Sequence, residues 1–226
     1  PLSMFFVLGF VLVLLVVMNV LLRNVPVRIF ELETLAPGVA LFGLTFMALF
    51  SGLLLAKDRS SAFLARLAAS PMTASDFLLG YLLPMLPLAA GQTAVCLGAA
   101  VALGLPLSWN LPAVVLSLIP SALLFIALGL LCGVLFNDRQ VGGVCGAILT
   151  NVTAWLAGIW FDLSLIGGPF QAVACALPFV HGVEGAKAAL AGDWAALPGH
   201  LLRVSLWAAA VMALAVGLFR RRLAER

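Results

Sequence analysis

Charged residues are scarce in this chain. Asp, Glu, Lys and Arg together make up 9% of its 226 residues, while apolar residues make up 64% and the mean hydropathy is +1.21. A water-soluble domain carries roughly 25% charged residues, so the composition excludes an ordinary soluble surface. It indicates a protein whose solvent is the lipid bilayer.

The chain also lacks the patterns of several enzyme classes. An ATP-binding P-loop needs GxxxxGK[ST], but the two lysines, Lys57 and Lys187, lie in LLLAKDRS and VEGAKAAL. There is no HExxH motif and no Ser, His and Asp set typical of hydrolases. The cysteines stand in apolar stretches without a CxxC pair: Cys96, Cys132, Cys145 and Cys175. We therefore expect no catalytic, ATP-binding, cofactor or metal site in this chain.

Ionisable residues are missing from the middle of the apolar stretches. A proton-coupled transporter needs Asp, Glu or His at membrane depth, and Asp162, which stands at the end of a stretch, fits a solvated carboxylate instead. Energy for any transport is therefore expected from a partner. The net charge of +3 comes from basic residues beside the apolar stretches, where they orient a membrane chain, so no nucleic-acid partner is predicted.

What the chain does have is a series of uncharged stretches, each about as long as the ~20 residues that cross a bilayer as a helix. They predict an all-α integral membrane protein with spans at about 2–22, 35–56, 77–103, 113–136, 140–161 and 201–219. A turn at Gly104 to Pro112 separates spans three and four, and Thr73 with Asp76 predicts a capping box before span three. Because the chain opens with Pro1 rather than Met, we expect a segment to precede it.

The stretch 163–199 decides between six spans and seven. Six spans with both termini in the cytoplasm place eight basic residues inside and four outside. The inner group is Lys57, Arg59, Arg66, Arg139, Arg220, Arg221, Arg222 and Arg226, and the outer group is Arg23, Arg28, Lys187 and Arg203. A seventh span would give six against six, and Pro169 and Pro178 interrupt the stretch. We therefore expect 163–199 to be a re-entrant or interfacial helix pair on the outer side.

The link between spans two and three predicts a short cytoplasmic helix over about 59–70. Phe63, Leu64 and Leu67 share one face of this helix, and Arg59 and Arg66 lie on the adjoining one. Such a helix either docks a partner protein or lies in the lipid headgroups, and the pattern alone favours neither.

The link and the outer stretch both resemble the permeases of ABC type-2 exporters. The resemblance is carried by FLARLAASPMTASDFLLG from Phe63 to Gly80, GIWF at 158–161, PFQ at 169–171 and LPFVHGVE at 177–184. With the six-span plan it extends over nearly the whole chain. One departure is that the family usually has an amphipathic helix before span one, whereas this chain starts at the span.

The resemblance implies a transmembrane permease subunit for efflux across the cell membrane. It implies pairing of two permeases, alike or related, in the lipid bilayer, driven by cytoplasmic ABC ATP-binding subunits that hold ATP and Mg²⁺. The link would then be the coupling helix, with ATPase docking assigned to Arg59, Phe63, Leu64, Arg66 and Leu67. The alternative is a non-transporting membrane anchor or assembly subunit that recruits a cytoplasmic partner through the same link.

Polar residues within the spans and the outer stretch are the other candidate site residues. The candidate substrate path consists of Asn19, Thr45, Gln92, Thr93, Asn151 and Thr153, which would otherwise hydrogen-bond neighbouring helices. In the outer segment, His181 and Glu184 are three residues apart on a predicted helix, where they would pair or bind a ligand. No residue identifies the substrate.

Overall fold

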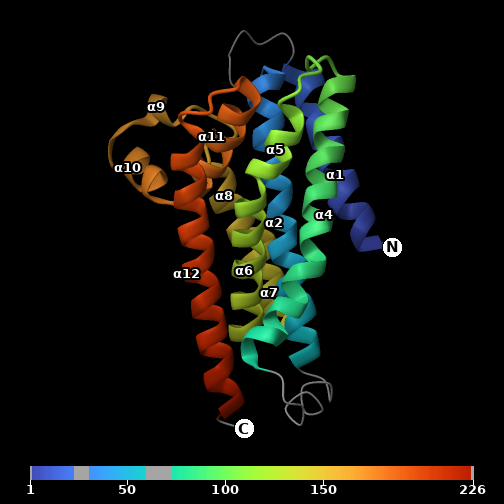
Figure 1. Ribbon diagram of the computed structural model, residues 1–226. Coiled ribbons are helices and arrows are strands. Elements are labelled where there is room, and N and C mark those ends of the chain that lie inside the picture. The colour runs from blue at the N-terminus through green and yellow to red at the C-terminus, as the bar shows by residue number, and fades with distance from the viewer. Residues whose placement is uncertain (1, 23–30, 60–72, 225–226) are drawn as a thin grey trace.

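The computed structural model describes residues 2–22, 31–59 and 73–224, and these ranges contain helices and turns but no strand (Figure 1). The all-α prediction is confirmed for this part of the chain. The helices are α1 (Leu2–Leu22), α2 (Leu32–Arg59), α4 (Ala74–Ala102), α5 (Leu111–Ser117), α6 (Ile119–Leu135), α7 (Asp138–Gly143), the π-helix η2 (Val144–Leu149), α8 (Thr150–Leu156), α9 (Leu163–Ile166), α10 (Gly168–Ala176), α11 (Pro178–Ala191) and α12 (Leu197–Ala224).

Within the described ranges, four helices are long and apolar enough to cross a membrane. They are Leu32–Arg59, Ala74–Ala102, Leu111–Leu135, which takes α5 and α6 together, and Leu197–Arg222. The part of α1 from Gly9 to Leu21 is a shorter apolar helix, and the predicted fifth span is divided among α7, η2 and α8. The chain is therefore a multi-pass membrane protein, and the count of six spans stays a prediction.

The long helices run along one axis and give the bundle two ends (Figure 1). We call the end that carries the turn between α4 and α5 and helices α9 to α11 the outer end, after the predicted orientation. The inner end carries the end of α2, the start of α4, the turn between α6 and α7, and the end of α12.

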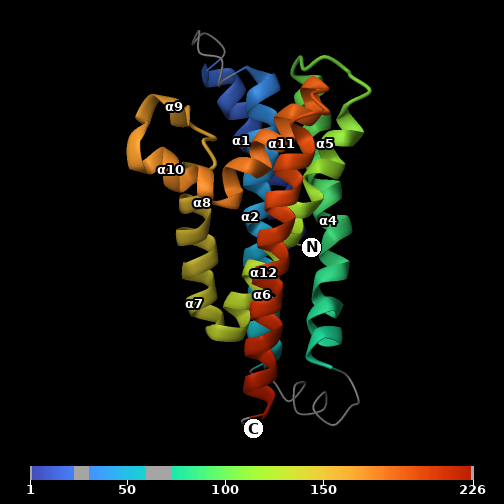
Figure 2. The ribbon, with the colours of Figure 1, turned by 60° about the vertical axis from the view of Figure 1, so that its left-hand side comes forward.

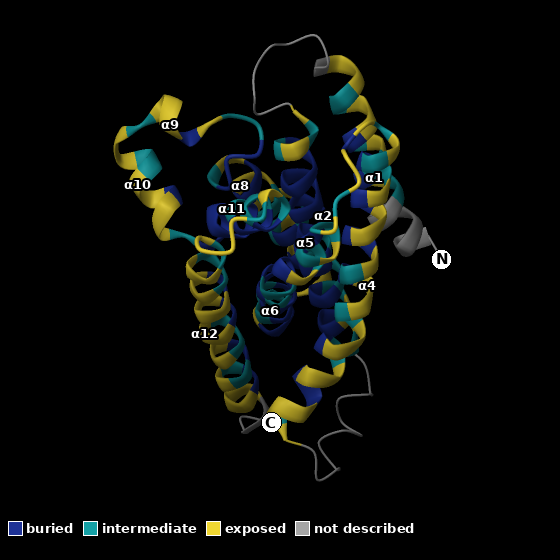
Figure 3. Cartoon of the chain, turned by 45° about the horizontal axis from the view of Figure 1, so that its top comes forward, coloured by how far each residue is buried: buried dark blue, intermediate teal, exposed yellow. Residues whose placement is uncertain are grey.

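Helix α2 lies at the centre of the bundle (Figure 3). In its most apolar stretch of 18 residues, 72% of the residues are buried, whereas the corresponding share in α12 is 17%.

Glycines allow α2 and α6 to pack closely at the core. A Cβ atom added to Gly133 would lie 2.7 Å from the Gly52 carbonyl oxygen, and one added to Gly129 would overlap the Ala48 carbonyl. Ser51 adds a hydrogen bond from its hydroxyl to the Ile126 carbonyl at 3.2 Å. Small residues that bring two helix backbones together are the usual basis of helix association in lipid, where the hydrophobic effect between helices is absent.

Helix boundaries agree with most predicted spans, but two differ. Helix α4 begins after Thr73, which forms the predicted capping box with Asp76. Span four is divided into α5 and α6 because Pro120, near the start of α6, has no N–H group to continue the helix. Span five was predicted to extend to 161. Its helix ends at Leu156, and Gly158 turns the chain with a φ of 65°, a conformation that favours glycine.

The stretch after span five forms three short helices instead of one long helix. Helices α9, α10 and α11 lie together at the outer end (Figure 2). Asn110, in the turn before α5, donates a hydrogen bond to the Leu190 carbonyl near the end of α11 at 3.1 Å. The last helix already begins at Leu197, slightly before the predicted end of the outer segment at 199. Whether this segment enters the bilayer stays a prediction.

Candidate functional site

The inner end holds the start of the predicted coupling link in a fixed position. The Arg59 guanidinium donates hydrogen bonds to the carbonyl oxygens of Val134 and Phe136, the latter at 2.8 Å. These carbonyls lie at the end of α6, where backbone oxygens have no partner within the helix and the helix dipole favours a cation. Arg222 of α12 donates to the Leu135 carbonyl at 3.3 Å and adds a second cation there.

Asp58 connects α2 to α4 at the same end. It accepts a hydrogen bond from the Tyr81 hydroxyl at 2.6 Å. Helices α2, α4, α6 and α12 are therefore joined next to the link by Asp58, Arg59, Tyr81 and Arg222, which we call the inner clasp. Sequence reasoning assigned only Arg59 a role here, and it assigned that residue to ATPase docking. The other predicted docking residues, Phe63, Leu64, Arg66 and Leu67, lie outside the described residues.

The predicted substrate-path residues lie on four helices, α1, α2, α4 and α8. Thr45 and Thr93 are buried, and their hydroxyls donate to the carbonyls of Phe42 at 2.6 Å and Ala89 at 2.9 Å in their own helices. Asn151 is exposed on α8, with its amide donating to the Ala147 carbonyl at 2.8 Å. Asn19 is half-buried on α1.

Two members of this set are buried without hydrogen bonds in the described part of the chain. Gln92 is 1% exposed and packs against Gly43, and neither its amide nitrogen nor its amide oxygen has a partner there. The Thr153 hydroxyl is likewise buried without a partner in that part. A polar group left unpaired at membrane depth costs free energy, so Gln92 is the strongest candidate in the set for a polar role within the spans.

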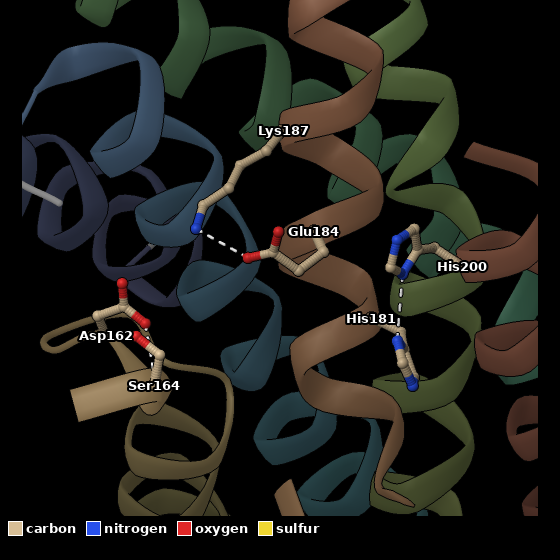
Figure 4. Close-up of polar contacts among 6 residues, drawn as sticks. All are labelled: Asp162, Ser164, His181, Glu184, Lys187 and His200. Carbon is tan, nitrogen blue, oxygen red and sulfur yellow. Dashed lines mark hydrogen bonds and ion pairs between the residues drawn. The ribbon is translucent and has the colours of Figure 1, made fainter. Parts of the chain in front are cut away.

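His181 lies at the outer end in a cluster formed by α10, α11 and α12. It is 6% exposed, and its Nδ1 lies 3.1 Å from His200 Nδ1, while its Nε2 lies 3.0 Å from the Cys175 carbonyl oxygen (Figure 4). The carbonyl can only accept a hydrogen bond, whereas the Arg203 guanidinium beside the same Nε2 can only donate one, so these two neighbours favour opposite tautomers of the ring. Arg203 Nη1 approaches Nε2 at 3.2 Å. Burial, with the charge of Arg203 and the neighbouring His200, lowers the pKa of His181, so the neutral ring is favoured.

Glu184 faces a different region from His181. Its Oε1 accepts a hydrogen bond from Lys187 Nζ at 2.9 Å, one turn along α11, and this ion pair lines a pocket beside α9 and α10 (Figure 4). The pocket has a volume of about 410 Å³. The structure thus gives His181 and Glu184 separate partners instead of pairing them with each other.

Asp162 on the opposite wall of this pocket was missed as a site residue. It precedes α9 and accepts a hydrogen bond from the Ser164 backbone N–H at 2.9 Å (Figure 4). This bond and a second one from the Ser164 side chain hold the pKa of Asp162 below its usual range, so the carboxylate stays charged. His200, Arg203 and Lys187 were also missed, because each meets its partners through the folding of the outer helices.

Comparison with known proteins gives the class and then the family. The structure is an apolar helical bundle with charged groups at its two ends. A model of the ABC-2 family transporter proteins matches residues 24–219, which is most of the chain, and this match identifies the class as a membrane transport permease. The chain belongs to the ABC-2 transporter family, and the predicted resemblance is confirmed. No curated protein matches the chain, and no solved structure matches it. Membrane components of this family are generally non-catalytic and generally pair with an ATP-binding subunit.

Proposed function

We propose that this chain is the permease of an ATP-driven exporter, that it works as a pair of permeases in the cell membrane, and that a separate cytoplasmic ATP-binding subunit holds the ATP and Mg²⁺. The family match over residues 24–219 carries this proposal. The given residues contain no P-loop pattern, which fits a permease driven by a separate ATP-binding subunit.

The inner clasp supports the proposed coupling role of the link. Arg59 and Asp58 tie the end of α2 to α6 and α4, and the capping box of Thr73 and Asp76 fixes the start of α4. A segment anchored at both ends passes a displacement to the helices that hold it. Movement of an ATPase against the link would therefore act on α2 and α4 directly, and through α6 on the core of the bundle.

Docking of the ATPase should depend on a few apolar side chains of the link. Burying one Phe or Leu side chain contributes roughly 1.5 to 3 kcal/mol, so Phe63→Ala and Leu67→Asp should each weaken association by about an order of magnitude or more. The measurement is the amount of ATP-binding subunit that copurifies with each variant, followed by ATP-driven transport in proteoliposomes. Leu107→Ala, in the exposed turn at the outer end, is the matched control. It should change neither the amount of copurified ATP-binding subunit nor the rate of ATP-driven transport.

These experiments also separate the exporter from the anchor. An anchor or assembly subunit would copurify with its partner but show no ATP-driven transport in proteoliposomes. If Phe63→Ala and Leu67→Asp both keep full association and transport, the link is not the docking element. The coupling proposal would then be withdrawn.

A further inference from the structure

The pocket at the outer end has a mixed lining contributed by several elements. Its residues come from α2, the turn after α8, α9, α10 and α11: Thr34, Ala157, Gly158, Asp162, Leu163, Ser164, Gln171, Cys175, Val180, Glu184 and Lys187. Its volume of about 410 Å³ lies within the roughly 300 to 1,000 Å³ of small-molecule sites. A chain with 9% charged residues places three of them around this one cavity.

The charges of the pocket favour a cation. Asp162 and Glu184 supply two carboxylates and Lys187 one ammonium, which leaves the lining with a formal charge of −1. Lys187 Nζ pairs with Glu184, 2.9 Å from its Oε1, and the charge of Lys187 also helps to lower the pKa of Asp162, so one ammonium group serves two carboxylates. Asp162 is oriented by Ser164 and stays ionised, so its negative charge is fixed at this wall. A protonated amine bound in this pocket would neutralise the excess negative charge of its lining.

The remaining lining fits an apolar body attached to such an amine. Leu163 and Val180 are buried aliphatic residues at the pocket wall, and Ala157 lies beside them. Gln171 and Thr34 add neutral hydrogen-bonding groups that tolerate either a donor or an acceptor on the ligand. Convergent charge on a partly apolar wall is the usual composition of a small-molecule site.

We propose that this pocket binds an amphiphilic amine, meaning a molecule with a protonated amino group on an apolar body, and that Asp162 and Glu184 recognise the amino group. Identifying such amines as the cargo released at the outer end rests on the proposed function. Binding itself does not require the ATP-binding subunit, so it is measured on the isolated permease. If no amine binds to the isolated permease, the transport and copurification results are unaffected.

The test uses the full chain in nanodiscs of phosphatidylcholine, titrated calorimetrically at pH 7. Phenethylamine is the probe, with phenylethanol as the neutral analogue and phenylacetate as the anionic one. We expect phenethylamine to bind at least tenfold more tightly than phenylethanol, and phenylacetate not to bind. Equal affinity for phenethylamine and phenylethanol would overturn the proposal, since recognition of the amine would then be absent.

Variants of opposite charge give the pocket a signature that a structural role does not share. Asp162→Asn and Glu184→Gln should each weaken phenethylamine binding about tenfold, whereas Lys187→Gln makes the lining more negative and should strengthen it. Asp138→Asn, at an exposed carboxylate of the inner end, is the control and should bind as the unchanged protein does. Circular dichroism checks that every variant is folded. Unchanged affinity in both carboxylate variants, each folded, would refute the site.

The same amine chemistry is found in free molecules and in lipid headgroups, and a second arm distinguishes the two sources. Replacing half of the phosphatidylcholine by phosphatidylethanolamine supplies the amine on a lipid. If this lipid weakens phenethylamine binding by competition, and does so less in Asp162→Asn, the pocket takes an aminophospholipid headgroup. If it has no effect, the pocket takes a free amphiphilic amine. Both results support amine recognition at Asp162.

Discussion

His181 shows how a single buried side chain can make this fold sensitive to pH. Its ring is hydrogen-bonded to His200 and to the Cys175 carbonyl, with Arg203 at 3.2 Å. The charge of Glu184, which faces away from His181, favours protonation of the ring, but this attraction is weaker than the burial that opposes protonation. Protonation of His181 would therefore place a second positive charge beside Arg203 within the joint of α10, α11 and α12.

We expect acid to destabilise the outer end. The pKa of His181 in the folded protein is below the ordinary value of 6.5, so the unfolded chain binds more protons between these two values. Stability is then fully present above pH 6.5 and is lost as the pH falls toward the folded-state pKa. The melting temperature should drop by a few degrees between pH 7.5 and pH 5.5.

The control is His181→Asn, which keeps a side-chain donor and removes the titrating ring. Its melting temperature should be lower than that of the unchanged protein at pH 7.5 but should vary less with pH. Differential scanning fluorimetry of both proteins in the same detergent provides the measurement. An identical pH dependence in the two proteins would show that another group is responsible.

At the scale of the helices, the α2 and α6 contact holds the bundle together. Their backbones approach so closely at Gly129 that a methyl group would overlap both the Ala48 carbonyl and the Ser51 hydroxyl. The Ala48 obstacle is backbone, so it cannot move aside as a flexible side chain can. Overpacking of this kind costs typically about 1 to 3 kcal/mol.

Gly129→Ala should therefore lower the melting temperature by several degrees, since about 1 kcal/mol corresponds to 2–4 °C in a chain of this size. Gly98→Ala on α4 is the matched control, because a Cβ atom there meets no atom within 4 Å apart from the adjoining backbone of α4. Alanine favours helix more than glycine does, so this control should be as stable as the unchanged protein or slightly more stable. Thermal unfolding of the three proteins gives the comparison. Equal losses in both variants would mean that helix propensity, not the close contact, decides.

The helices were predicted from the sequence where a single local feature sets their position, and they were missed where contacts between distant parts of the chain set it. Uncharged length placed α2, α4 and α12, and the capping box at Thr73 predicted the start of α4. The end of α8 was missed, because Gly158 carries no local mark that distinguishes it from the packing glycines of other spans. The π-helix η2 was not predicted either. His181 and His200 are 19 residues apart and meet only because α11 packs on α12, so no periodicity connects them.

At the scale of the whole molecule, the contacts of charged side chains in the described residues gather at the two ends of the bundle. The inner clasp lies beside the link proposed to dock the ATPase, and the pocket proposed to bind amines lies at the outer end. The predicted orientation, with eight basic residues inside and four outside, places these two features on opposite sides of the membrane. An exporter requires this separation, because energy enters on one side and cargo leaves on the other.

Cys175 offers a direct test of that orientation, because it is exposed on α10 at the outer end, while Cys96 and Cys145 are buried. A membrane-impermeant maleimide added to intact cells should label the unchanged protein, and Cys175→Ser should abolish this labelling. A cysteine added after Arg226 in the Cys175→Ser background should react only once the membrane is opened, since the C-terminus is predicted to face the cytoplasm. Labelling is read by the mass shift of the purified protein. If the added cysteine reacts in intact cells while Cys175 reacts only in opened ones, the orientation is inverted, and the pocket near Asp162 would face the cytoplasm as an entry site instead of a release site.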